Sequence, residues 1–538
     1  MSGSWSFEHI ARHTLTIRLV IPTPYPRLLM FSARKLATNP GTLRALSSLK
    51  SLTNRLFSSN VVVNKVYKTA AEAVAASGLK DGDKLLAGGF GLSGIPMTTI
   101  NAIHAAGVKD LTVVSNNCGT DYWGLGILLN SKRIRRMVSS YVGENEEFQR
   151  QYLEGELEVE LTPQGTLAEK LRAGGAGIPA FYTRTGVGTD IQFGGVPIKY
   201  TKTGEVVMAS KPKDVRVFDG KTYLLEESIR GDVSIIKGWR ADKYGNIQFR
   251  GTARNFNPDV AMAGRFCIAE VDEIVEIGEI KPEDVHLSGG FVHAIVLTDQ
   301  PKKIERLTER ATDEKPVDKN SSRYRMARRA SLEVKPGMKV NLGIGVPTEV
   351  SNHIPEEMKV MFQSENGLLG MGPFPNPGEA DADYINAGKQ TITVVPGASI
   401  FSSSESFAMI RGGHVDVTIL GGLEVAQNGD LANWVVPKQK VKGMGGAMDL
   451  VACGSRVIVT LEHCNKKGQS KILKRCALPL TGQGVADLII TDLAVFEVDK
   501  KHEQLILIEK LDSITIDELK AKTEANFIVS PNLTTYRQ

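Results

Sequence analysis

The chain of 538 residues has few cysteines, and no two of them stand in a C-x-x-C pattern. An odd number without that spacing predicts neither a disulfide framework nor a zinc site held by cysteine pairs. We therefore expect the folded protein to work in a reducing compartment. The five cysteines are Cys118, Cys267, Cys453, Cys464 and Cys476.

Long hydrophobic runs are also absent. No uninterrupted apolar stretch approaches the roughly 18 residues that are needed to cross a bilayer, although 42% of the residues are hydrophobic. That composition is ordinary for a globular protein. The sequence therefore predicts no membrane insertion, and its length predicts two domains of roughly 200 to 250 residues each.

Acidic residues are missing from one long stretch. Between His9 and Ala71 there is no Asp or Glu, whereas arginine, lysine and serine are frequent. An acid-free, Arg-rich and Ser-rich N-terminus is typical of an organelle transit peptide, and residues 43–60 place leucines on one helical face. We interpret residues 1–60 as such a peptide, with translation starting at Met1 or Met30. A disordered basic tail is the alternative.

The net charge of +5 arises in the same stretch. Residues 1–60 hold eight of the 65 basic residues and one of the 60 acidic residues, which leaves 57 basic against 59 acidic residues in the remaining chain. A basic footprint on the folded part is what nucleic-acid binding requires. We therefore expect no nucleic-acid partner.

From about residue 62, short apolar runs alternate with helix-like segments. Residues 84–89 and 111–117 are typical of strands, and residues 97–107 are typical of a helix. This alternation predicts a parallel or mixed α/β sheet. A charged stretch at 301–322, poor in large apolar side chains, is predicted to be a linker between the two domains.

After the linker the pattern repeats. "LKDGDKLLAGGFGLSGIP" (79–96) is echoed by "VKPGMKVNLGIGVP" (334–347), and "LTVVSNN" (111–117) by "KVMFQSEN" (359–366). We therefore predict two similar open α/β domains, 61–300 and 323–525, followed by a C-terminal tail at 526–538. The repeat aligns Asn116 with Glu365. Because ligands bind beyond the carboxyl ends of strands in such sheets, these two residues can meet over one substrate if the halves face each other.

The glycine loop "GGFGLSGIP" (88–96) contains a literal G-x-G-x-x-G. A dinucleotide site also needs an acidic residue at the end of the next strand, and here that strand ends in Ser115, Asn116 and Asn117. A dinucleotide site and a purely structural turn remain alternatives. We favour a loop that lets an anionic or thioester substrate approach backbone N–H groups.

Glu365 stands in "FQSENGLLG" (362–370), where its repeat partner carries no charge. A solvated glutamate beside an Asn-Gly turn is the alternative. With an ordinary pKa of about 4.3, the carboxylate would be ionised at neutral pH and could attack an activated acyl group without a base. Such an attack needs donors for the developing oxyanion. Asn116 and a backbone N–H of the glycine cluster "KGMGGAMD" (442–449) are the candidates, although that cluster could also be a simple turn.

The two motifs "DGDKLLAGGFGLSGIP" (81–96) and "FQSENGLLG" resemble the signatures of the family I coenzyme A transferases. Residues 65–525 resemble the family's mitochondrial members, in which both subunits are fused. The resemblance implies the fold of glutaconate coenzyme A transferase and of certain sugar-phosphate isomerases. It also implies a homodimer of the mitochondrial matrix that moves coenzyme A from succinyl-CoA to acetoacetate or another 3-oxo acid, by a ping-pong reaction in ketone-body catabolism.

Residue by residue, the resemblance implies that Glu365 is the nucleophile that becomes a glutamyl-CoA thioester. Asn116 and the backbone N–H of Gly446 would be the oxyanion donors, and no metal or cofactor would be needed. The cations Lys389 and Lys442 are candidates for contacts with a carboxylate, with solvated surface lysines as the alternative. Further candidate substrate contacts are Gly88, Gly89, Phe90, Gly91, Gly94, Asn366, Gly367 and Lys389.

Two rival hypotheses remain open at this point. An isomerase of the same fold would use Glu365 as a general base, and a scaffold protein would keep the fold without turnover. Only a transferase should retain coenzyme A covalently.

Overall fold

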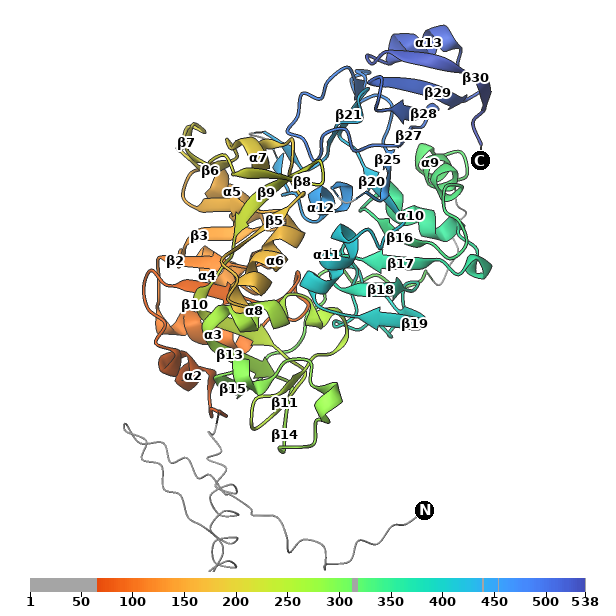
Figure 1. The fold of residues 1–538 in the computed structure, drawn as a ribbon. Coiled ribbons are helices and arrows are strands. Elements are labelled where there is room, and N and C mark those ends of the chain that lie inside the picture. Colours follow the sequence, from red (N-terminus) through yellow and green to blue (C-terminus); the bar gives the residue numbers. More distant parts are fainter. Residues whose placement is uncertain (1–64, 312–317, 438–439, 453, 538) are drawn as a thin grey trace, which may run out of the picture. The chain divides into compact units, whose positions relative to one another are not determined.

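The computed structural model describes residues 65–311, 318–437, 440–452 and 454–537. The predicted transit peptide and its start site lie outside these residues. The chain from residue 64 onward forms one compact unit, and Figure 1 draws its described residues in colour. Among the described helices, none has the length and apolar character that crossing a membrane requires.

The N-terminal half is built on a seven-stranded sheet in which every pair of neighbours is parallel. Its strands at Lys84–Ala87 and Leu111–Val114 are short and mostly apolar, as expected where helices cover both faces of a sheet. In sheet order the seven strands are β15 (Ala294–Leu297), β13 (Gly264–Val271), β10 (Gly231–Lys237), β1 (Lys84–Ala87), β2 (Leu111–Val114), β3 (Ile134–Ser139) and β4 (Glu158–Leu161).

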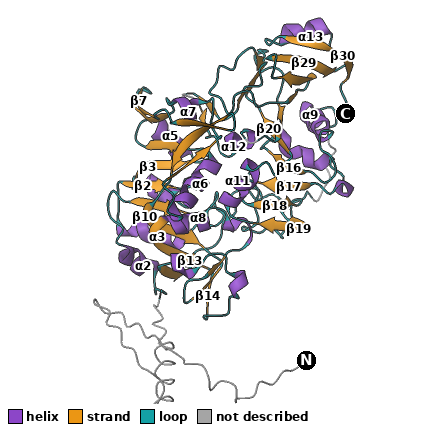
Figure 2. Cartoon of the chain, in the orientation of Figure 1, coloured by secondary structure: helices purple, strands orange, loops and turns teal. Residues whose placement is uncertain are grey.

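The two faces of this sheet bury alternate residues of the same strands. Leu85 packs with α2 (Ala70–Ser77) and α3 (Met97–Ala106), whereas Leu86 packs with α6 (Gln164–Gly175) and α8 (Asn257–Ala263). Figure 2 shows the helices on either side of the strands. The other helices of this half are α4 (Gly126–Asn130), α5 (Glu146–Leu153) and α7 (Asp190–Phe193).

The C-terminal half contains a ten-stranded mixed sheet. Neighbours from β17 to β27 are parallel, and the pairs at β18, β19 and β28 are antiparallel. The order is β19 (Val394–Ile400), β18 (Leu368–Met371), β17 (Met361–Ser364), β16 (Lys339–Leu342), β20 (Val417–Gly421), β25 (Arg456–Thr460), β27 (Leu488–Ile490), β28 (Ala494–Asp499), β29 (Gln504–Lys510) and β30 (Phe527–Thr535).

Helices cover both faces of the central part of this sheet. Val340 and Ile419 pack with Met326 of α9 (Ser322–Ser331), on the side that also holds α10 (Val346–Glu349). On the other side lie α11 (Ser403–Arg411) and α12 (Ala447–Val451), and α13 (Ile516–Lys522) follows near the end of the chain. The predicted pair of open α/β halves is confirmed.

The smaller sheets and hairpins lie outside the two main sheets. They are formed by β5 (Ala180–Thr183), β6 (Pro197–Tyr200), β7 (Val206–Ala209), β8 (Val215–Phe218), β9 (Lys221–Glu227), β11 (Arg240–Asp242), β12 (Ile247–Gln248), β14 (Glu273–Val275), β21 (Glu424–Ala426), β22 (Leu431–Ala432), β23 (Val435–Val436), β24 (Lys440–Val441) and β26 (Ile472–Leu473).

The two halves meet through helices. Phe407 of α11 and Leu167 of α6 belong to one continuous hydrophobic cluster, and the region between the two sheets in Figure 1 holds α6, α8, α11 and α12. Hydrogen bonds cross the same boundary. The hydroxyl of Ser404 donates to Asp259 at 2.7 Å, and the backbone N–H of Gly165 donates to Asp449 at 2.9 Å.

The prediction that residues 526–538 form a C-terminal tail is wrong. Residues 527–535 form β30, which pairs with β29, and the Tyr536 hydroxyl donates to the carbonyl of Thr491. Pro531 makes this segment a poor strand by sequence, but β30 lies at the edge of the sheet, where a missing N–H donor is tolerated.

The described part of the predicted linker, residues 301–311, does more than connect the halves. The backbone N–H of Arg310 donates to the carbonyl of Pro375, and that of Thr308 donates to the hydroxyl of Thr391. Arg306 forms an isolated bridge with Gln390. This segment therefore packs along residues 373–391 of the C-terminal half.

Candidate active site

Glu365 follows the last residue of β17 and begins the turn into β18. Gly367 completes that turn at a φ of +113°, and a Cβ there would lie 2.2 Å from the carbonyl oxygen of Phe401. The buried Asn366 accepts a hydrogen bond from the Ser364 hydroxyl and donates one to the carbonyl of Ile385. Asn366 and Gly367 thus fix the turn that presents Glu365, and neither lines the cavity described below. Their role in substrate contact stays a prediction.

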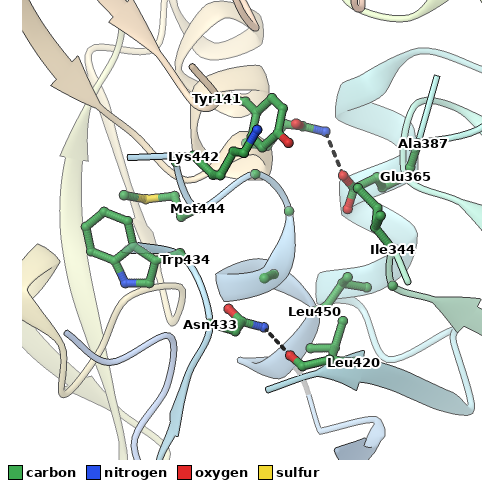
Figure 3. A pocket seen from close by; sticks show the side chains of 18 of the residues that line it. Tyr141, Ile344, Glu365, Ala387, Leu420, Asn433, Trp434, Lys442, Met444 and Leu450 are labelled. Atoms are coloured by element: carbon green, nitrogen blue, oxygen red, sulfur yellow. Dashed lines mark hydrogen bonds between the residues drawn. The ribbon is translucent and has the colours of Figure 1, made fainter. Parts of the chain in front are cut away.

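A cavity of about 370 Å³ opens between the two halves and reaches the Glu365 side chain. Asn116 and Gln164 line it from the N-terminal half, and Gly446 lines it from the C-terminal half. Trp434, Met444 and Leu450 supply apolar surface, as Figure 3 shows. The predicted trio of Glu365, Asn116 and Gly446 is therefore brought to one cavity.

Two donors hold the Glu365 carboxyl group. The backbone N–H of Gly446 donates to it, and Nε2 of Gln164 donates to its Oε1 at 3.3 Å, which is the dashed line drawn to Glu365 in Figure 3. A Cβ at position 446 would lie 1.9 Å from Oε2 of Glu365. Only glycine therefore allows this backbone N–H to approach so closely.

Asn116 reaches Glu365 through a second amide. Its Nδ2 donates to Oε1 of Gln164 at 2.8 Å and to the Ser140 hydroxyl at 3.0 Å. Gln164, which the sequence reasoning missed, is the first residue of α6 and follows β4 by three positions. Its position could have been found from the sequence, because Gln164 lies beyond the carboxyl end of β4, a third parallel strand whose end faces the site. The role of Asn116 as an oxyanion donor stays a prediction.

The expectation that Glu365 has an ordinary pKa is wrong. Burial, with a further contribution from the nearby Asp449 carboxylate, raises its pKa to about 7, against the opposing effect of the Gln164 and Gly446 donors. The charged form is disfavoured because protein atoms replace water around the carboxyl group. Sequence alone could not show this environment, since it arises where the two halves meet.

Asp449 is the second carboxyl group of the site. Its pKa is raised to about 6 by burial, which outweighs the opposing charge of Arg411 and the hydrogen bonds that it accepts. It accepts hydrogen bonds from the backbone N–H of Gly165 at 2.9 Å and from the Thr185 hydroxyl at 3.0 Å. Asp449 thereby ties the start of α6, which carries Gln164, to α12, which begins just after Gly446.

The glycine loop 88–94 packs mainly on the protein itself. A Cβ at Gly88 would lie 1.9 Å from Oδ1 of Asn257, and one at Gly94 would lie 2.5 Å from the carbonyl oxygen of Ala253. A Cβ at Gly89 would lie 2.5 Å from the Ile95 side chain. Phe90 lines the cavity, whereas the loop's glycines do not. Substrate contacts by Gly88, Gly89, Gly91 and Gly94 stay predictions.

The two candidate lysines differ in environment. Lys389 is buried, and its Nζ lies 2.8 Å from Oε1 of Glu305 and 5.2 Å from the ring centre of Tyr141. A solvated surface lysine is therefore excluded at this position. Lys442 is partly exposed at the cavity wall and donates to Oε1 of Glu144 at 2.6 Å.

Comparison with known proteins adds independent information. A model of the family described as coenzyme A transferase matches residues 67–298 and 323–522. The chain belongs to the coenzyme A transferase family. The two matched segments of this transferase coincide with the two α/β halves.

Two mammalian relatives of this coenzyme A transferase match most of its length. The mouse succinyl-CoA:3-ketoacid coenzyme A transferase 2A, mitochondrial, is 54% identical over 470 residues, which cover 86% of this chain and 90% of the mouse protein. The human succinyl-CoA:3-ketoacid coenzyme A transferase 2, mitochondrial, is 51% identical over 477 residues, which cover 88% of this chain and 92% of the human protein.

A solved structure supports the fold of the transferase. The apoenzyme of the acyl-CoA transferase YdiF from Escherichia coli O157:H7 superposes with a TM-score of 0.70 at 21% identity, over 88% of this chain and 95% of YdiF. At that identity the likeness concerns the fold.

Proposed function

We propose that the protein transfers coenzyme A from succinyl-CoA to acetoacetate or another 3-oxo acid, through a thioester formed on Glu365. The observation that carries this proposal is the Glu365 carboxyl group itself, which faces a cavity between two donors, Gly446 N–H and Gln164 Nε2. The names of the mouse and human relatives support the choice of substrates.

The first half-reaction begins with a carboxylate oxygen of Glu365. It attacks the thioester carbon of succinyl-CoA, the carbon–sulfur bond breaks, and the thiolate of coenzyme A leaves with the electron pair. The product is a mixed anhydride of succinate and Glu365. The thiolate then attacks the Glu365 carbonyl carbon, and succinate leaves with the bridging oxygen. Glu365 is left as the thioester of coenzyme A.

The second half-reaction runs the same steps in reverse with the acceptor. The carboxylate of acetoacetate attacks the Glu365 thioester and releases the thiolate, which forms an acetoacetyl anhydride on Glu365. The thiolate then attacks the acetoacetyl carbonyl carbon and expels the Glu365 carboxylate. Acetoacetyl-CoA is formed and the free enzyme returns. No proton is gained or lost overall, and the reaction as written needs no metal or cofactor.

The environment of Glu365 suits a residue that loses its charge during the reaction. Burial and the Asp449 carboxylate both disfavour the Glu365 carboxylate, as its raised pKa reflects. The anhydride and the thioester are uncharged at this position, so both escape that penalty. The Gly446 N–H and the amide chain from Asn116 through Gln164 are the donors available to the oxyanion of each tetrahedral intermediate.

We further propose that the protein acts as a homodimer in the mitochondrial matrix, after removal of the N-terminal transit peptide. The names of the mouse and human relatives, both described as mitochondrial, support the organelle. The acid-free composition between residues 9 and 71 supports a cleaved import signal.

Covalent capture tests the proposal. The purified protein is mixed with succinyl-CoA in the absence of acceptor, and its intact mass is measured before and after addition of acetoacetate. We expect a gain of one coenzyme A less one water, mapped to the Glu365 peptide and lost on adding acetoacetate. The variant Glu365→Gln should show no gain. Binding of succinyl-CoA without an adduct would contradict the proposal and favour a general-base isomerase or a scaffold protein.

A further inference from the structure

One wall of the cavity carries a group of charged side chains that the reaction above does not use. Lys442 and Arg306 both contact the same oxygen, Oε1 of Glu144, at 2.6 Å and 3.3 Å. All three residues line the cavity. Their side chains are 27%, 44% and 51% exposed, in the order Lys442, Arg306 and Glu144. We call these three residues the rim triad.

The rim triad has one positive charge more than it has negative charges. The neighbouring Lys389 does not add to this excess, because it is already paired with Glu305 at 2.8 Å, and both side chains of that pair are less than a tenth exposed. Two cations therefore share a single carboxylate at the rim. The rim triad therefore has a net charge of +1, which one further anion could balance.

The two ion pairs differ in how easily they can open. Separating Lys389 from Glu305 would leave a buried charge without a partner, which is strongly unfavourable. Glu144 is half exposed, and water screens its attraction to Lys442 and Arg306, so exposed pairs of this kind contribute little. An incoming carboxylate can therefore displace Glu144 but not Glu305.

Tyr141 connects the rim triad with the reacting carboxyl group. It lines the same cavity, and burial raises the pKa of its phenol, with smaller contributions from the carboxylates of Glu144 and Glu365. The phenol therefore lies within electrostatic range of both groups. Because Glu365, Tyr141 and the rim triad line one cavity, a ligand bound there can contact the reacting carboxyl group and the rim triad together.

The two acyl groups of the proposed reaction differ in charge at the end remote from the thioester. A succinyl group ends in a carboxylate, whereas an acetoacetyl group ends in a methyl group and has an uncharged ketone one carbon nearer the thioester. A fixed pair of cations suited to the first group would lack a counter-charge with the second. A fixed neutral site would leave the succinyl carboxylate without a partner.

We propose that Glu144 is an exchangeable counter-ion that lets one cationic subsite, formed by Lys442 and Arg306, accept both acyl groups. The inference rests on the proposed function. With a succinyl group bound, its carboxylate takes the place of Glu144, which turns towards water. With an acetoacetyl group bound, Glu144 stays paired with the two cations, while the ketone oxygen accepts a hydrogen bond from them.

The test compares the two donors in the first half-reaction. Rates of Glu365 thioester formation from succinyl-CoA and from acetoacetyl-CoA are measured separately, and the ratio of their kcat/KM values is the readout. In Glu144→Gln, the ratio should shift about tenfold towards succinyl-CoA, because no internal carboxylate competes for the cations. In Lys442→Gln, it should shift in the opposite direction by a similar factor.

Charge compensation gives a sharper version of the same test. The double variant Glu144→Gln/Lys442→Gln restores the single excess positive charge of the rim triad, so its ratio should return towards that of the unchanged chain. Glu144→Asp keeps the charge and should leave the ratio near its starting value. Glu503→Gln is the matched control, because it removes an exposed carboxylate paired with Arg475 outside the cavity lining.

The outcomes separate this inference from the proposed function. If neither donor forms a thioester on the unchanged chain, the proposed function fails. If thioesters form but Glu144→Gln leaves the ratio unchanged, or slows both donors equally, Glu144 is a structural side chain and the inference is overturned. Thermal unfolding of each variant shows whether it is folded. If Glu144→Gln or Lys442→Gln is unfolded, the donor ratio of the other single variant tests the inference.

Discussion

At the scale of single residues, the central feature is a glutamate whose surroundings oppose its charge. Burial disfavours the charged form of Glu365 and the Asp449 carboxylate repels it, whereas Gln164 and Gly446 donate hydrogen bonds to it. The same surroundings favour the uncharged thioester. Its raised pKa is therefore part of the chemistry, because a more basic carboxylate is also a stronger nucleophile.

The pH dependence of the first half-reaction should report this pKa. Because the ionised carboxylate attacks, kcat/KM for thioester formation should rise with pH up to about 7 and level off above it. In Asp449→Asn the midpoint should move to lower pH, since one repelling charge is gone. Stopped-flow measurement between pH 5 and 9 checks both profiles. An unchanged midpoint in the variant would contradict the role given to Asp449.

Gly446→Ala should abolish the close approach of its backbone N–H to Glu365. The added Cβ would lie 1.9 Å from Oε2, so the carboxyl group or the loop must move. We expect thioester formation to slow by about 100-fold or more, as when one oxyanion donor is lost, with binding of succinyl-CoA largely kept. Single-turnover kinetics measure the rate. Gly445→Ala is a useful comparison, because nothing lies within 4 Å of its Cβ, although its φ of +49° makes the substitution strained.

At the scale of elements, the glycine loop after β1 acts chiefly through close packing. Asn257 of α8 fills the space beside Gly88, where it accepts a hydrogen bond from Lys237 and donates one to the carbonyl of Gly94. The loop thus packs and hydrogen-bonds α8 against the end of β1. Of the glycines in the literal G-x-G-x-x-G pattern, Gly94 takes part in this contact, because a Cβ there would lie 2.8 Å from Nδ2 of Asn257.

Gly88→Ala should therefore destabilise the fold by about 1 to 3 kcal/mol, the usual cost of forcing a methyl group into a filled site. The reason is the 1.9 Å approach of the new Cβ to Oδ1 of Asn257. Chemical denaturation measures the free energy of unfolding. Gly290→Ala serves as the control, because its nearest neighbour, the Ser288 hydroxyl, lies 3.6 Å away. Equal effects of the two substitutions would contradict the packing argument.

Sequence reasoning succeeded where the signal is local to one element. Glu365 and Asn116 could be predicted because each follows a strand, and strand ends of open α/β sheets gather at one edge. Gln164 follows the same rule but lies outside the repeated motifs that align Asn116 with Glu365. Asp449 and Glu305 could not be predicted, because their effects depend on packing between α6 and α12 and along the 301–311 segment. The edge strand β30 was missed because of Pro531.

At the scale of the whole molecule, the site exists because the two halves dock. Gln164 comes from the N-terminal half and Gly446 from the C-terminal half, and Asp449 joins α12 to the start of α6. The docking surface also buries Asp259, which accepts hydrogen bonds from the backbone N–H and hydroxyl of Ser404. Groups that titrate within this surface link its stability to pH.

Asp259 should make the fold less stable as pH rises. Burial raises its pKa to about 7 in the folded chain, against an ordinary value of about 3.9 in the unfolded chain. The folded state therefore favours the protonated form, and this stabilisation is present below about pH 4 and lost as pH rises through about 7.

Asp259→Asn should remove this decrease of stability with rising pH. Relative to the unchanged chain, its thermal unfolding midpoint should increase between pH 5 and pH 8, because the variant has no carboxyl group to ionise at this position. Calorimetry at several pH values measures the difference. The exposed Asp214→Asn should show no such trend. A constant difference between Asp259→Asn and the unchanged chain across this range would refute the linkage.

The central claim is that an oxygen atom passes between the substrate carboxylate and Glu365 during turnover. The most direct measurement is the mass of the Glu365 peptide after turnover with succinate labelled with heavy oxygen in its carboxylates, in the presence of acetoacetyl-CoA. We predict that heavy oxygen enters the Glu365 carboxyl group, because each anhydride shares its bridging oxygen between the two partners. Turnover without label in that peptide would show that Glu365 is not the nucleophile.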